Sequence, residues 1–173
     1  MIVKGVMTPG VESVTGDTTV KQAAERMRRL NVGALPVMEF PLDYQNFKSA
    51  DGGKSASGRF EVGKGKAHKS DGSVLGILTD RDIAVRAAAC GKSPNRTRVS
   101  EIMSKNVAWV YDDQDVEEAA KLMQEKKIRR LLVKNREGQV IGIVSLGDIS
   151  TTSSLELAGE TVREISEPSQ PER

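Results

Sequence analysis

Apolar residues recur with a helical period in two stretches of this chain that are 96 residues apart. They follow steps of three and four residues after Asp17, and the stretch after Asp113 repeats the same stripe. The two stripes are Val20, Ala23, Ala24, Met27 and Leu30, and Val116, Ala119, Ala120 and Met123. Such a period predicts an amphipathic helix in each place.

Short apolar runs on either side of each stripe predict strands. They are Val11–Val14, Leu35–Met38 and Val74–Leu78 in the first copy, and Val107–Val110, Leu131–Val133 and Val140–Val144 in the second. A further helix is predicted at Asp82–Ala89, ending before Gly91, with a weaker counterpart after Asp148. Each copy therefore has the order β-α-β-β-α. A single copy of about 60 residues buries little surface alone, so we predict an α/β (α+β) fold of two repeats packed face to face.

The offset between the two copies changes once along the chain. It is 96 residues from Met7 to Val37 and 66 residues from Val74 onward, so the first copy holds an insertion of about 30 residues. We predict a first repeat at 1–95 with an insertion at 39–71, and a second repeat at 96–150. The acidic remainder, 151–173, is expected to be a flexible tail.

Charge and cysteine content narrow the function classes. The 26 Lys and Arg residues nearly balance the 24 Asp and Glu residues, so the net charge of +2 gives no electrostatic argument for nucleic-acid or membrane binding. Cys90 is the single cysteine, which excludes an intramolecular disulfide and fits a reducing compartment. We expect Cys90 to pack in or near the core. With no apolar run of bilayer length and no secretory leader, the expected location is the cytoplasm.

One motif, Gly-x-x-Ser/Thr-x-x-Asp, occurs once in each copy. It reads Gly76, Thr79 and Asp82 in the first copy, and Gly142, Ser145 and Asp148 in the second. The glycine permits close approach of a base or of a neighbouring strand. A hydroxyl and a carboxylate three residues apart lie on one side of a helix, and an ionised aspartate accepts the hydroxyls of a ribose.

The same spacing is that of a helix capping box, which contributes about 1 kcal/mol of stability and no function. The residues alone leave both interpretations open. Carboxylates turned onto their own backbone amides would argue against ribose binding.

Taken together, the ordered motifs resemble a tandem pair of CBS domains, the stand-alone Bateman module. The resemblance covers about residues 1–38 and 72–150. The first copy carries it in Met7-Thr8, Val32–Val37 and Gly76–Ile83, and the second in Met103-Ser104, Ile128–Val133 and Gly142–Ile149. It implies a non-catalytic regulatory protein that binds an adenine nucleotide (AMP, ADP or ATP) between the repeats, with no other cofactor. Apolar helix stripes left uncovered by the repeats predict a homodimer, and no metal is expected.

The resemblance also implies two unlike nucleotide sites. Site 1 would use Thr8, Val11, Val32, Arg129, Arg130, Ser145 and Asp148, and site 2 would use Thr79, Asp82, Lys105, Val107 and Ile128. In ligand-binding relatives, residues at the positions of Arg129 and Arg130 reach phosphate, whereas the first copy has Gly33-Ala34 there. Site 1 is therefore expected to bind phosphate better. The alternative for the two arginines is a solvent-exposed strand edge.

The insertion suggests an alternative function. It holds many glycines and lysines, and four of the chain's six aromatic residues: Phe40, Tyr44, Phe47 and Phe60. A lid, a partner-docking hairpin and an RNA-binding loop are all open. Hence the chain could instead be a ligand-independent, dimeric interaction module of a stress response that captures a protein partner through 39–71.

Other chemistry finds little support in the sequence. The stretch Gly58–Gly65 resembles a phosphate-binding loop but lacks its final hydroxyl residue. His68 is the single histidine, so neither a histidine-based metal cluster nor a catalytic triad is predicted. We expect no catalytic residues, and we expect Trp109 to pack in its strand rather than to stack on a base.

Overall fold

The computed structural model describes residues 1–39 and 74–167. The insertion beyond Glu39, with its aromatic residues and His68, lies outside them, so the predictions made for it stay predictions. The chain forms two compact units. The amino-terminal unit is Glu12–Met103, and the carboxy-terminal unit combines Met1–Val11 with Ser104–Arg173. The amino-terminal segment thus belongs with the second copy, and the repeat boundaries at 95 and 150 remain a prediction about the sequence.

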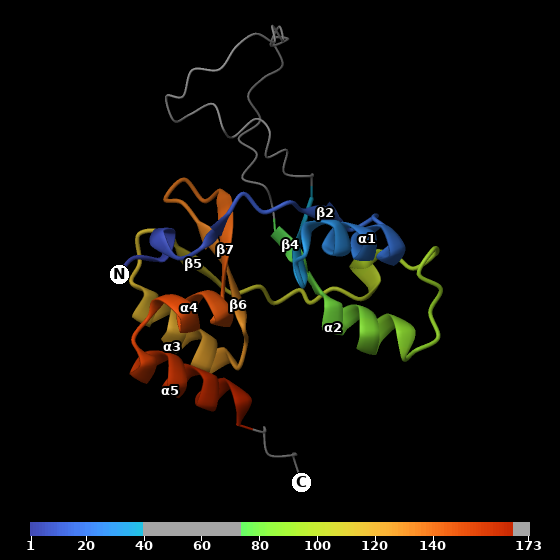
Figure 1. Cartoon of the computed structure of the whole chain (residues 1–173). Helices are drawn as coiled ribbons and strands as arrows, with labels where there is room; N and C mark the ends of the chain where they lie inside the picture. Colours follow the sequence, from blue (N-terminus) through green and yellow to red (C-terminus); the bar gives the residue numbers. More distant parts are fainter. Residues whose placement is uncertain (40–73, 168–173) are drawn as a thin grey trace, which may run out of the picture. The chain divides into compact units, whose positions relative to one another are not determined.

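The amino-terminal unit has a three-stranded sheet in the order β2-β3-β4, with β2 parallel and β4 antiparallel to β3 (Figure 1). Its elements are β2 (Val14–Thr15), α1 (Val20–Leu30), β3 (Ala34–Met38), β4 (Val74–Thr79), α2 (Asp80–Asp82), the π-helical continuation η3 (Ile83–Ala88) and η4 (Val99–Glu101). Val20, Ala23 and Met27 of α1 are buried. The predicted stripe of this helix is therefore its core face.

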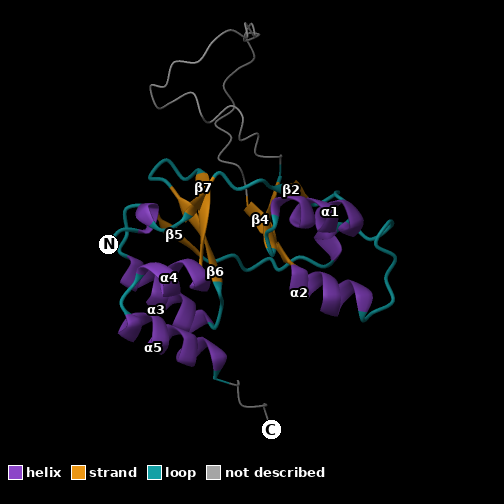
Figure 2. Ribbon diagram, viewed as in Figure 1, coloured by secondary structure: helices purple, strands orange, loops and turns teal. Residues whose placement is uncertain are grey.

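The carboxy-terminal unit has a four-stranded sheet in the order β1-β7-β6-β5. Its elements are η1 (Val3–Gly5), β1 (Thr8–Pro9), β5 (Trp109–Tyr111), α3 (Val116–Lys126), β6 (Arg130–Lys134), β7 (Val140–Ser145), α4 (Leu146–Thr152) and α5 (Leu155–Ser166). Helices α3, α4 and α5 lie on one face of this sheet (Figure 2). Leu131, Val133 and Val144 point into the core between the sheet and these helices.

The mixed α+β class and the repeated helix and strand pattern are confirmed, but the flexible tail is wrong. Most of the predicted tail is helix α5, which begins after Ser154. Ala158, Thr161 and Ile165 bury one side of α5, and Gln124 Nε2 of α3 donates to Thr161 Oγ1 at 2.9 Å. The tail is ordered because this side of the helix completes the core of the unit.

Of the two predictions made for residues just after η3, one is confirmed and one is wrong. Gly91 has φ +66°, which suits the left-handed helix end that its position predicted. Cys90 is exposed, so the prediction that it packs in or near the core is wrong. Across the two described ranges, no helix has the length and apolar character needed to cross a bilayer.

Candidate functional site

Both motif aspartates take part in helix capping boxes. Thr79 donates to Asp82 Oδ2 through its amide at 2.9 Å and its hydroxyl at 2.7 Å, and the Asp82 amide donates back to Thr79 Oγ1 at 3.1 Å. Ser145 and Asp148 repeat the arrangement at 2.7, 2.7 and 3.2 Å. The capping interpretation is confirmed in both copies. It counts against ribose binding through the oxygens that do the capping.

The two copies differ in the partner of the second carboxylate oxygen, the one that does not take part in capping. Asp82 Oδ1 lies 3.3 Å from Nη1 of Arg86, and this Asp82 side chain is 10% exposed. Asp148 Oδ1 has no hydrogen-bond or ion-pair partner within residues 1–39 and 74–167, and Asp148 is only partly buried. Capping therefore leaves Asp148 one oxygen that can accept further hydrogen bonds.

Strand register gathers three site 1 residues on one face of the four-stranded sheet. Thr8 lies opposite Ile143 across β1 and β7, and Arg130 lies opposite Ser145 across β6 and β7. Ile143 and Ser145 are two residues apart, so they and their partners share a face. Because Leu131 and Val144 point toward the helices, Thr8, Arg130 and Ser145 occupy the opposite face.

The two arginines predicted to reach phosphate are not committed elsewhere. Arg129 is exposed and Arg130 partly buried, and neither guanidinium has a hydrogen-bond or ion-pair partner in the described part of the chain. The Arg129 carbonyl accepts from the amide of Leu146 at 2.9 Å, which fixes the backbone beside the start of α4. Arg130 lies opposite Ser145, the capping partner of Asp148. Two guanidinium groups without partners among the described residues, in the strand start beside this motif, suit an anionic ligand that also carries hydroxyls.

Of the two roles predicted for the motif glycine, Gly142 has the structural one. A Cβ there would lie 2.8 Å from both the Thr8 carbonyl oxygen and Met7 Sδ. The absent side chain therefore lets β1 approach β7, and this approach brings Thr8 to the site.

The remaining predicted residues are divided between the units. Val11 ends the amino-terminal segment of the carboxy-terminal unit, whereas the exposed Val32 belongs to the amino-terminal unit. For site 2, Thr79 and Asp82 belong to the amino-terminal unit. Its other members, Lys105, Val107 and Ile128, belong to the carboxy-terminal unit. Combinations that draw on both units stay predictions.

An aromatic and cationic group on edge strand β5 was not anticipated. Trp109 lies in β5, but it is 40% exposed, so the prediction that it packs there is not confirmed. Its ring lies 4.9 Å from the edge-on Tyr111 ring, and Lys134 Nζ lies 4.9 Å from its centroid. Arg136 lies over Tyr111 and binds both oxygens of Asp113 at 2.8 and 2.9 Å. That pairing lowers the pKa of Asp113 and raises the pKa of Arg136. The alternation of Trp109 and Tyr111 was the available sequence signal.

Within residues 1–39 and 74–167, no three His, Cys, Asp or Glu side chains are grouped closely enough to hold a metal ion.

Comparison with known proteins agrees with the resemblance seen in the sequence. The CBS domain family matches residues 3–45 and 99–153. The CBS domain-containing protein YhcV of Bacillus subtilis is 33% identical over 165 residues, which cover 95% of this chain and 94% of YhcV.

Solved structures agree in fold. A hexameric CBS-CP12 protein from bloom-forming cyanobacteria matches with a TM-score of 0.66 and 27% identity, over 90% of this chain and 73% of that one. The CBS domain pair of protein MJ0100, solved with 5′-methylthioadenosine and S-adenosyl-L-methionine, matches with a TM-score of 0.61 over 87% of this chain and 98% of that one. At 24% identity, the second match shows a shared fold alone.

Proposed function

Because the chain belongs to the CBS domain family as a tandem pair, we propose that it is a non-catalytic regulatory protein that binds an adenine nucleotide. The ligand would be AMP, ADP or ATP, held chiefly by the carboxy-terminal unit, in a cytoplasmic homodimer. Residues Thr8, Arg129, Arg130, Ser145 and Asp148 would form the core of the site. Val11 and Val32 complete the proposed set.

The observation that carries this proposal is the second Asp148 oxygen, which has no partner among the described residues, in a motif whose Ser145 lies opposite Arg130 across β6 and β7. An ionised carboxylate oxygen accepts the two hydroxyls of a ribose, and guanidinium groups bind phosphate through paired N–H donors. A 5′-nucleotide carries both groups on one molecule. The capping bonds hold the Asp148 side chain in one orientation, so it is ordered before the ligand arrives.

A thermal unfolding experiment with several adenine compounds tests the proposal. A ligand that binds only the folded state raises stability by about 2.7 kcal/mol when its concentration is 100 times Kd. Millimolar AMP, ADP, ATP, NAD and S-adenosylmethionine are each added, and we expect the melting temperature to rise most with AMP, ADP or ATP. The proposal fails if none of these compounds moves the transition.

Matched asparagine variants separate ligand binding from capping. In Asp148→Asn the amide oxygen keeps the bonds from Ser145, while an NH₂ group replaces the uncommitted oxygen. We expect this variant to melt close to wild type without nucleotide and to lose the nucleotide-induced shift. Asp82→Asn is the control at the equivalent position and should retain most of the shift. Equal nucleotide-induced shifts in wild type and Asp148→Asn would show that the motif serves capping alone.

A further inference from the structure

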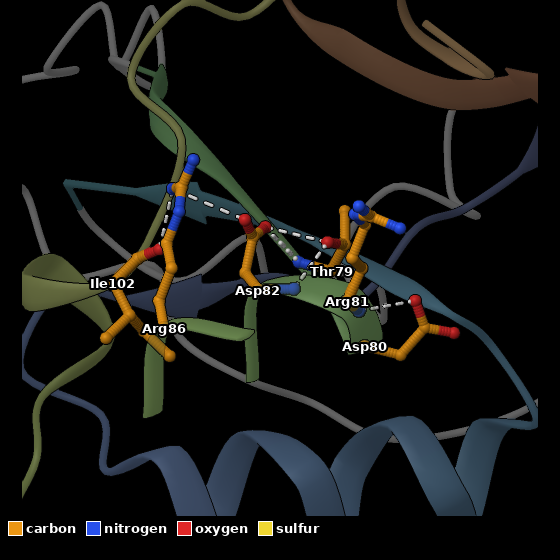
Figure 3. A network of polar contacts seen from close by, with 6 residues as sticks. All are labelled: Thr79, Asp80, Arg81, Asp82, Arg86 and Ile102. Atoms are coloured by element: carbon orange, nitrogen blue, oxygen red, sulfur yellow. Dashed lines mark hydrogen bonds and ion pairs between the residues drawn. The ribbon is translucent and has the colours of Figure 1, made fainter. Parts of the chain in front are cut away.

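We propose that Arg86 is a specificity-determining residue. It forms an ion pair with the second carboxylate oxygen of Asp82 and so favours nucleotide binding through Asp148. This inference rests on the proposed function, since it concerns which of two equivalent motifs takes the ligand. It is carried by contacts inside the amino-terminal unit, shown in Figure 3.

The Arg86 guanidinium lies between a carboxylate and a backbone carbonyl (Figure 3). Nη1 is 3.3 Å from Asp82 Oδ1 and donates to the carbonyl oxygen of Ile102 at 3.0 Å. Asp82 Oδ2 meanwhile accepts both bonds from Thr79. Both oxygens of this largely buried carboxylate are therefore in use, and a ribose hydroxyl would compete with a positive charge for Oδ1.

The second copy lacks this contact and serves as an internal comparison. The offset of 66 residues that pairs Asp82 with Asp148 pairs Arg86 with Thr152. The Thr152 hydroxyl donates to the Asp148 backbone carbonyl, not to its carboxylate. The two motifs thus share their capping geometry and differ in the group that faces the second oxygen. Arg86 accounts for the difference between them.

The bridge also connects the motif to the end of the amino-terminal unit. Ile102 is buried and directly precedes Met103, the last residue of that unit. A ligand that takes Oδ1 of Asp82 must displace Arg86, and the Ile102 carbonyl then loses its side-chain donor. A ligand bound at the Asp82 motif would therefore change the contacts at Ile102, where the chain leaves the amino-terminal unit.

Calorimetric titration with AMP tests the assignment, using wild type, Arg86→Thr and Arg86→Lys. Threonine is the residue of the second copy. We expect wild type to bind one AMP per chain tightly, and Arg86→Thr to bind a second AMP at least about tenfold more tightly than wild type does, as expected when a charge-assisted bond no longer competes. Arg86→Lys keeps the charge and should resemble wild type. Adding Asp82→Asn to Arg86→Thr should remove the gain.

Two results would overturn the role of Arg86. Unchanged binding in Arg86→Thr would show that the bridge does not compete with the ligand. Weaker binding would show that Arg86 itself contacts the phosphate.

A measurement without nucleotide distinguishes this failure from failure of the proposed function. A double-mutant cycle of Arg86→Thr and Asp82→Asn, followed by urea unfolding, should give non-additive losses if the two side chains interact. Additive losses would overturn the bridge whatever the titrations show. Absence of AMP, ADP and ATP binding in every variant, with non-additive losses, would overturn the proposed function and the ligand preference but leave the bridge in place.

Discussion

At Gly142, a single missing side chain decides how close two strands come. The backbone carbonyl of Thr8 occupies the space that a Cβ would need, and backbone cannot move aside as a flexible side chain does. We expect Gly142→Ala to lower the free energy of unfolding by about 1–3 kcal/mol, the usual cost of overpacking. Urea unfolding measures the change.

Gly159 of α5 is the matched control, because a Cβ there meets no atom within 4 Å. An alanine at this helical position should leave stability unchanged or raise it by about 0.5–1 kcal/mol. Equal effects of the two substitutions would mean that the approach of β1 imposes no constraint.

Individual residues also show how far sequence reasoning reached at the site. The motif pair Ser145 and Asp148 was found from spacing, and so was the capping alternative that the structure confirms. The ion pair of Arg86 with Asp82 was not predicted, although the two residues stand at a helical spacing of four. The bond from Arg86 to Ile102 could not be predicted, because it joins residues 16 apart whose approach depends on how η3 and η4 pack.

Among the elements, helix α5 shows what packing adds to a weak sequence signal. Ile165 is 8% exposed and belongs to the core that α5 covers, whereas Leu155 at the start of the same helix is 92% exposed. We expect Ile165→Ala to lower the free energy of unfolding by about 2–4 kcal/mol, since it removes buried atoms and leaves a cavity. Urea unfolding followed by circular dichroism gives the value.

Leu155→Ala is the matched control on the same helix. Surface substitutions usually change stability by no more than about 0.5 kcal/mol. If both variants lose the same stability, or neither loses any, α5 does not contribute to the core as its burial indicates.

Helices with a clear period and most of the short central strands were predicted, and α4 was predicted as a weaker helix, whereas β1 and α5 were not predicted. Helices α1 and α3 have wide apolar stripes, so their period alone identified them. Strand β1 has two residues and no period, because it exists only through pairing with β7. Helix α4 forms despite its serines and threonines, and the hydroxyls of Ser150 and Thr151 donate to carbonyls of the preceding turn rather than remaining unpaired.

For the whole molecule, the path of the amino-terminal segment is the feature that repeat counting could not supply. Spacing assigned the start of the chain to the first copy, yet Val3 and Val6 are buried in the core of the carboxy-terminal unit. The amides of Val3 and Lys4 donate to the carbonyls of Gln114 and Asp112, both at 2.8 Å. Similarity between the copies indicates which segments share an origin, but it does not show with which unit a segment packs. Burial of the side chains shows that.

Deleting Met1–Gly10 should consequently destabilise the carboxy-terminal unit first. The deletion removes two buried valines and several backbone hydrogen bonds, a loss on the order of 5 kcal/mol and a large part of what a small domain possesses. Hydrogen exchange followed by mass spectrometry locates the effect. We expect protection to fall across β5 to α4, while α1 and β3 stay protected.

Val14→Ala provides the opposite control, because Val14 is 1% exposed in the core of the amino-terminal unit. That variant should lower protection in α1 and β3 and spare α3. Loss of protection in α1 and β3 after deletion of Met1–Gly10, with α3 unaffected, would show that the segment supports the unit to which the sequence repeat assigned it. The two variants together therefore decide which unit depends on the start of the chain.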